Sequence, residues 1–86
     1  MTPEQCRAAR AWLGLKQDEL ATAAGVGLST LKDFEAGKRT PIANNLAAIE
    51  AALEAQGMGF VSATDDNGKT WACGITFAPP EKGTAH

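Results

Sequence analysis

Few residues in this sequence could support covalent or metal chemistry. Cys6 and Cys73 are the only cysteines and lie far apart in the chain, and the single histidine is the last residue, His86. A metal site needs several clustered ligands, and nucleophilic or general-base catalysis usually relies on a placed imidazole. We therefore expect small buried thiols, no metal, no cofactor and no enzymatic activity. A small hydrolase is the enzyme alternative, but the sequence offers neither a general base nor a pocket for one.

A second set of residues points to hydrogen bonding with another molecule. Leu31 and Phe34 lie three residues apart and could face a core, which would turn Ser29, Lys32 and Asp33 outward. Another short helical segment and a glycine turn precede these residues. In such a pair of helices, the one that follows the turn is suited to insertion into the DNA major groove. The pattern therefore favours binding to DNA.

The charge balance argues mildly against that hypothesis. The net charge is −2, whereas DNA-binding domains usually carry a basic excess. Up to Asn45, however, the chain has six basic and five acidic residues, and beyond it two basic and five acidic ones. Because salt screens exposed charges over about 8 Å, their position matters more than their total. A locally basic surface in the first half therefore remains compatible with DNA.

Local start and stop signals mark the helices that position these side chains. Thr2, Pro3 and Gln5 have the form of an N-cap, a first-turn proline and a capping-box partner, so a helix is expected over residues 3–13, ended by Gly14. Further helices are predicted over residues 17–24, closed by Gly25, over residues 28–36, and from a second Thr-Pro signal at Thr40-Pro41 to Gly57, with Ile42, Leu46, Ile49 and Leu53 at helical spacing. The sequence thus predicts a mainly α fold with a four-helix core.

After Gly57 the hydrophobic period changes from helical to alternating. Asp65-Asp66-Asn67-Gly68 is a strong turn signal, so a C-terminal β-hairpin is expected, with Trp71, Ile75 and Phe77 on one face. An isolated two-stranded ribbon is marginal in water, and something should cover it. Either the hairpin folds back on the fourth helix, or two protomers pair strands; we favour a homodimer. The predicted dimerisation residues are Phe60, Trp71, Ile75 and Phe77.

These patterns divide the chain into three segments. We expect a DNA-binding unit over residues 1–57, a hairpin over residues 58–78 and a disordered tail over residues 79–86. No apolar run approaches the length of a membrane span, and the N-terminus lacks the features of a signal peptide. We therefore expect a cytoplasmic protein without membrane contact.

The residues of the first half also carry a family resemblance. The relevant segments are Leu13-Gly14-Leu15-Lys16-Gln17-Asp18-Glu19-Leu20-Ala21, Gly25-Val26, Ser29-Thr30-Leu31 and Phe34-Glu35-Ala36-Gly37-Lys38-Arg39-Thr40-Pro41. In residue type and spacing this pattern closely resembles the Xre family, the Cro and lambda-repressor type of helix-turn-helix protein, from about residue 7 to residue 55. The resemblance implies a lambda-repressor-like core that binds double-stranded DNA.

The resemblance also implies roles for individual residues. By position, it assigns base-edge contacts to Leu28, Ser29, Lys32 and Asp33, phosphate contacts to Gln17, Lys38, Arg39, Asn44 and Asn45, and a structural ion pair to Arg10 and Glu35. Gly27 departs from the family pattern, which usually has a Ser or Thr N-cap there, and should weaken the start of the third helix by a few tenths of a kcal/mol. The expected function is a transcriptional regulator, a repressor or autoregulator that reads a partly palindromic operator. The alternative is an interaction module or antitoxin of the same fold that binds a protein partner through the apolar hairpin.

Overall fold

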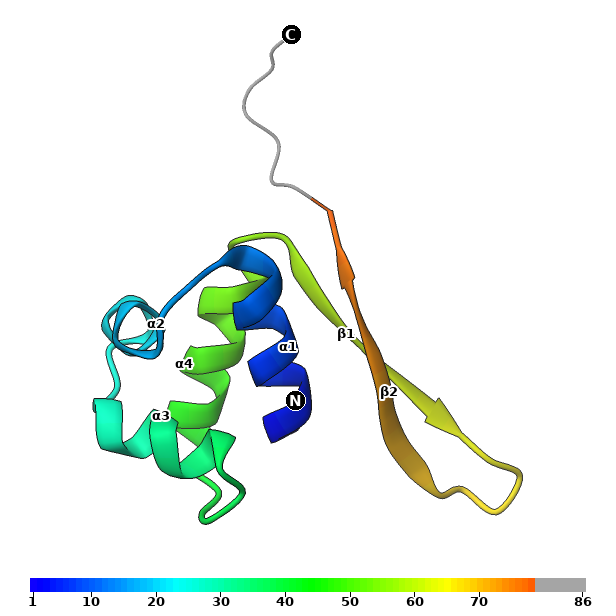
Figure 1. The fold of residues 1–86 in the computed structure, drawn as a ribbon. Coiled ribbons are helices and arrows are strands. Elements are labelled where there is room, and N and C mark those ends of the chain that lie inside the picture. The colour runs from blue at the N-terminus through cyan, green and yellow to red at the C-terminus, as the bar shows by residue number, and fades with distance from the viewer. Residues whose placement is uncertain (79–86) are drawn as a thin grey trace, which may run out of the picture.

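The computed structural model describes residues 1–78, which form a four-helix body followed by an antiparallel hairpin (Figure 1). The elements are α1 (Pro3–Leu13), α2 (Gln17–Ala24), α3 (Leu28–Glu35), α4 (Ala43–Glu54), β1 (Met58–Thr64) and β2 (Thr70–Phe77). The predicted fold class, a mainly α core followed by a C-terminal hairpin, is confirmed. The tail predicted to be disordered, residues 79–86, lies outside the described residues.

The start of α1 follows its sequence signals. The Thr2 side chain accepts a hydrogen bond from the Gln5 backbone N–H at 3.1 Å, and the Gln5 side chain accepts one from the Thr2 backbone at 3.0 Å. Pro3 occupies the first turn, and Gly14 ends the helix in the left-handed conformation with φ 71°. An N-cap of this kind stabilises a helix by about 1 kcal/mol, so α1 is well defined by local contacts alone.

The start of α4 differs from the prediction. Thr40-Pro41 was expected to open this helix, but it begins at Ala43, with Ile42 as an extended N-cap residue. Pro41 is buried, so the chain packs this proline against the body before it turns into a helix. Ile42 is consequently 70% exposed and does not join the core stripe of Ile49 and Leu53.

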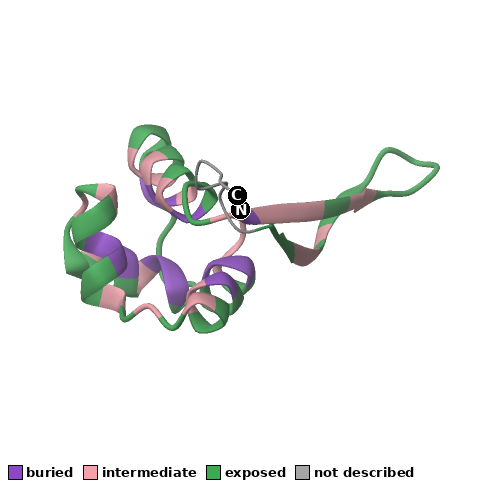
Figure 2. Ribbon diagram, turned by 90° about the horizontal axis from the view of Figure 1, so that it is seen from above, coloured by how far each residue is buried: buried purple, intermediate pink, exposed green. Residues whose placement is uncertain are grey.

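The core lies between the inward faces of the helices (Figure 2). Leu20, Leu31, Ile49 and Leu53 are fully buried, as is Cys6. Cys73 is exposed, so the prediction of a buried thiol is wrong for that residue. The complete cluster is Cys6, Ala9, Leu20, Ala21, Leu31, Phe34, Ile49, Leu53 and Met58. Burying each large aliphatic side chain contributes about 1.5–3 kcal/mol, and because these residues come from all four helices, the core fixes how α3 is presented.

The hairpin contains a β-bulge that changes which side chains share a face. Val61 pairs with Gly74 and Ser62 pairs with Ala72, so Cys73 is an extra residue in β2. Because one extra residue reverses the alternation of side chains, Trp71 lies on the face opposite Ile75. The prediction that Trp71 shares a face with Ile75 and Phe77 is therefore wrong.

The inner end of the hairpin packs on its own chain. Met58 is buried, and Phe60 and Ile75 pack against the helical core. The Phe77 ring lies against Trp12 of α1, with the ring centroids 5.9 Å apart. The hairpin thus rests on α1 as well as on α4, while its turn end extends away from the helices (Figure 1). We call residues 58–77 the arm and residues 3–54 the helical body.

Within residues 1–78, no helix has the length and apolar character needed to cross a membrane.

Candidate nucleic-acid interface

The centre of the candidate interface is the pair α2 and α3, two helices of eight residues each. Between them, Gly25 adopts the left-handed conformation with φ 69°, and the Val26 backbone N–H donates to Ala21 O at 3.0 Å. This closure ends α2 and leaves only three residues, Gly25, Val26 and Gly27, to connect it to α3. Because Leu20 and Leu31 are both fully buried, the two helices are held together by the core and not by the connecting turn alone.

The outer surface of α3 carries the side chains predicted to meet base edges. Ser29 and Lys32 are exposed and lie three residues apart, so they are neighbours on one helix face. Leu28 is 37% exposed at the start of the helix. Asp33 is half-buried, and its backbone carbonyl accepts a hydrogen bond from Lys38 N at 2.9 Å. Three of the four predicted residues are therefore presented to solvent, while Asp33 lies nearer to the following loop.

Behind this face, the Glu35 carboxylate is the centre of a buried network. Arg10 donates to both of its oxygens at 2.9 Å, and Glu35 itself is only 3% exposed. Gln17 Nε2 donates to Oε1 at 3.0 Å, and the Cys6 thiol donates to Oε2 at 3.3 Å. Arg7 donates to the Glu35 backbone carbonyl. The network ties α1, α2 and the end of α3 into one unit.

These contacts shift the pKa values of the groups involved. Burial is the largest single cause acting on Glu35 and would raise its pKa, but the hydrogen bonds from Arg10, Gln17 and Cys6 together hold the pKa below its ordinary value. The hydrogen bond to Glu35 raises the pKa of Arg10. Burial, reinforced by Glu35, raises the pKa of Cys6 to about 12. The pair Arg10–Glu35 is therefore fully charged at neutral pH, and Cys6 stays a thiol.

Gln17 has two roles to reconcile. The family resemblance implies a phosphate contact, and in the structure one N–H of the Gln17 amide donates to Glu35. A side-chain amide has two N–H donors, so the second can meet a phosphate while the first holds the network. Gln17 thereby connects a candidate contact directly to the buried ion pair.

Sequence reasoning missed two cations next to Gln17. A groove of about 470 Å³ lies where α1, α2 and α3 meet. We call it the basic groove; its lining residues are Arg7, Arg10, Lys16, Gln17, Lys32, Glu35 and Ala36. Arg7 could have been found from its spacing, because it lies three residues before Arg10 and so on the same side of α1. Lys16 could have been found from its place immediately before α2.

The remaining predicted phosphate contacts lie around the loop from α3 to α4. Lys38 and Arg39 are exposed in this loop, Asn44 is exposed, and Asn45 is half-buried in the first turn of α4. The Ile42 side chain cannot accept a hydrogen bond, so the first backbone N–H groups of α4 rely on other partners. Such N–H groups, together with the helix dipole, favour a phosphate.

The basic side chains of the first half and the acidic pair Asp18 and Glu19 lie on different parts of the surface. Each of the six basic residues in the first 45 positions either lines the basic groove or lies in the loop after α3. Asp18 and Glu19 instead line a separate depression with Thr22 and Ala23. The geometry therefore offers an exposed helix face with cations beside it, the arrangement expected for major-groove reading with phosphate contacts.

Comparison with known proteins agrees with this geometry. A family model described as Helix-turn-helix matches residues 7–56, more than half of the chain, including α2, α3 and the loop that follows. A search of curated proteins gives no significant match. The match covers the elements that build the interface, and its span agrees with the resemblance to the Xre type. This chain therefore belongs to the helix-turn-helix family of DNA-binding regulators.

Proposed function

We propose that this protein represses or autoregulates transcription in the cytoplasm by binding a partly palindromic operator as a homodimer. The observation that carries the proposal is the exposed face of α3, which holds Ser29 and Lys32 and is bordered by basic residues. A helix of this kind enters the major groove, where each base pair presents a distinct pattern of donors and acceptors.

Base contacts would come from the exposed side chains of α3. Lys32 can donate to guanine O6 or N7, Ser29 can donate or accept, and Leu28 can contact a thymine methyl group. Asp33 can accept from a cytosine amino group or orient Lys32. Without an arginine on this face, which could make a bidentate contact to guanine, affinity per protomer is modest, and two half-sites are needed for tight binding.

Phosphate contacts would flank the reading helix. Lys38 and Arg39, with Asn44 and Asn45 at the start of α4, would meet the backbone on one side. Gln17 and the cations of the basic groove would meet it on the other. These contacts set position and register, whereas base contacts set sequence preference.

Dimerisation would use the arm. Two helix-turn-helix units must present their reading helices about 34 Å apart to bind consecutive major grooves, and strand pairing across a two-fold axis can hold them there. Of the four predicted dimerisation residues, Phe60, Ile75 and Phe77 already pack on their own chain, whereas Trp71 is 46% exposed on the opposite face. The Trp71 face and the free strand edges are therefore the surface we propose for the partner protomer.

The test is a gel-shift titration against DNA upstream of the protein's own gene, at two salt concentrations and with scrambled competitor. We expect specific binding that weakens with salt, with a logarithmic slope of about 0.9 per phosphate contacted. Arg39→Ala should reduce that slope. Lys69 is an exposed cation in the arm, and Lys69→Ala is the matched control that should leave the slope unchanged.

A second candidate function is an interaction module or antitoxin. The exposed Trp71, on an arm whose turn carries Asp65 and Asp66, favours it. Absence of binding to specific and scrambled DNA alike, together with a salt-insensitive complex with a protein, would support this function and contradict the operator reader.

A further inference from the structure

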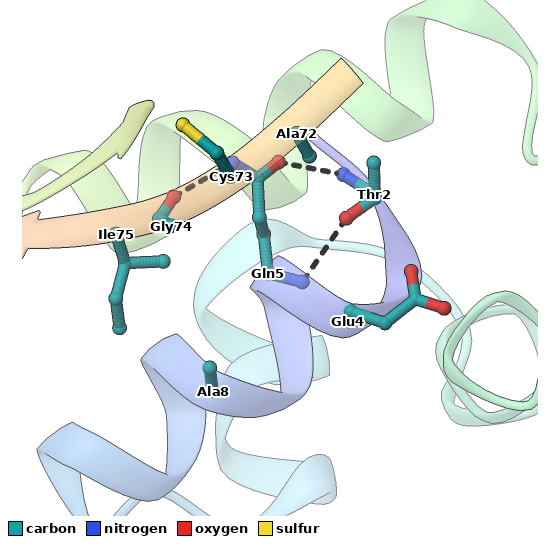
Figure 3. A pocket seen from close by; sticks show the side chains of 8 residues that line it. All are labelled: Thr2, Glu4, Gln5, Ala8, Ala72, Cys73, Gly74 and Ile75. Carbon is teal, nitrogen blue, oxygen red and sulfur yellow. Dashed lines mark hydrogen bonds between the residues drawn. The ribbon is translucent and has the colours of Figure 1, made fainter. Parts of the chain in front are cut away.

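Gln5 links the helical body to the arm. Its side chain is part of α1 and only 5% exposed. While Oε1 accepts from the Thr2 backbone, Nε2 donates to Val61 O at 3.2 Å and to Gly74 O at 2.9 Å (Figure 3 shows Gln5 beside β2). Within residues 1–78, these two bonds are the only side-chain hydrogen bonds between the helices and the hairpin.

The two carbonyls belong to the β-bulge. Val61 and Gly74 form the last pair before the register changes. The extra residue Cys73 lies between Gly74 and Ala72, the next paired residue of β2. A bulge interrupts the ladder and makes the strands bend and twist more strongly. The Gln5 amide uses both of its N–H groups on the carbonyls at this bend. Gln5 therefore binds the arm at the point where the direction of the strands changes.

The other contacts between body and arm are apolar. Met58, Phe60 and Ile75 pack on the core, and Phe77 lies against Trp12. Burial of apolar surface is not directional, so these few contacts at the inner end of the arm constrain its angle less sharply than hydrogen bonds would. A cavity of about 450 Å³ beside Gln5, between α1 and β2, leaves room for the arm to change its angle. Hydrogen bonds, in contrast, have preferred directions.

We infer that Gln5 is a positioning residue that sets the direction of the arm relative to α3, and thereby the spacing of DNA half-sites that the dimer accepts. This inference rests on the proposed function. The strand β1 has seven residues and spans about 23 Å. A swing of about 10° about its inner end therefore moves its turn end by about 4 Å. One base pair advances the helix by about 3.4 Å. A small change in arm direction is thus comparable to one step of half-site spacing.

The experiment separates the two roles of Gln5. Gln5→Glu keeps an oxygen for the Thr2 backbone but turns a carboxylate oxygen toward the two carbonyls, while Thr2→Ala breaks the capping box and leaves Nε2 in place. Gln5→Met, which removes donors without adding charge, is the second test variant. Circular dichroism melting establishes that each variant is folded.

Binding is measured for the full chain on DNA selected in vitro with the wild type. The probes carry two half-sites at the selected spacing, the same half-sites one base pair closer or farther, and a single half-site. We expect the wild type to prefer its spacing by about fivefold or more, a typical coupling between sites. Gln5→Glu and Gln5→Met should lose that preference to within about twofold, with single half-site affinity unchanged, and Thr2→Ala should keep it.

Two results would overturn the inference while leaving the proposed function intact. In the first, the Gln5 variants bind single half-sites normally and keep the wild-type spacing preference. In the second, Thr2→Ala loses the preference as fully as Gln5→Glu, which would make Gln5 only a capping residue. Failure of the wild type to bind any of the probes would instead defeat the proposed function, and this inference with it.

Discussion

Replacing Glu35 by glutamine should destabilise the fold, because the carboxylate is the acceptor for four buried or half-buried side-chain hydrogen bonds. Oε1 accepts from Arg10 Nη2 and Gln17 Nε2, and Oε2 accepts from Arg10 Nε and Cys6 Sγ. An amide replaces one oxygen with an NH₂ group. Whichever oxygen is replaced, one bond from Arg10 and one from Gln17 or Cys6 are lost. The new NH₂ group then faces the two donors that had bonded to that oxygen.

The magnitude follows from these contacts. All four bonds are accepted by a charged group, and each such bond contributes about 1.5–3 kcal/mol, so losing two of them in Glu35→Gln should cost at least about 3 kcal/mol at pH 7. This agrees with the roughly 3–5 kcal/mol found when one partner of a buried ion pair is removed, reduced here because the Arg10 side chain is 22% exposed. In a domain of this size each kcal/mol lowers the Tm by about 4–8 °C. Urea denaturation and thermal melting, both followed by circular dichroism, measure the loss.

The dependence on pH gives an independent check. Because the pKa of Glu35 is lower in the folded protein, its charge stabilises the fold above the ordinary glutamate pKa of about 4.3, and this contribution is lost as pH falls through the folded-state value. The difference between wild type and Glu35→Gln should therefore shrink in acid. Glu54→Gln, at an exposed position in α4, is the matched control and should change stability by less than about 0.5 kcal/mol. A loss below about 1 kcal/mol for Glu35→Gln, or a difference constant down to strongly acidic pH, would refute the reasoning.

Three further predictions concern the interface, the arm and the thiols. Lys38→Ala should weaken binding to all DNA sequences alike, whereas Ser29→Ala should change which sequence is preferred; in vitro selection followed by titration measures both, and the reverse pattern would overturn the site assignment. Trp71→Ala should shift the protein from dimer to monomer in sedimentation with little change in melting, because its ring lies on the face away from the helical body; an unchanged dimer would contradict the proposed surface. A thiol reagent should modify Cys73 and spare Cys6 in the folded protein, since Cys6 is fully buried with its pKa raised to about 12; equal modification, read by mass spectrometry, would contradict the described core.

The sequence by itself determined the features whose physical cause lies within a few residues. The capping box of Thr2 and Gln5, the left-handed Gly14 and Gly25, and the turn around Asp65 are all local hydrogen-bonded structures, and all are present as predicted. The order of elements and the mainly α class follow from such signals and from hydrophobic spacing. The residue types around α2 and α3 were also sufficient to indicate the family.

Only the tertiary structure decided the features that depend on residues far apart in the chain. The Gln5 bonds to the arm join positions 56 and 69 residues apart, so no local pattern reveals them. The side of the arm on which Trp71 lies depends on one unpaired residue in the ladder, which alternation in the sequence cannot show. Arg7 and Lys16 line the basic groove together with Lys32 because α1 and α2 both pack against α3. In each case the physical reason is the same: a contact between distant segments is set by how the whole core packs, and not by the preferences of the residues nearby.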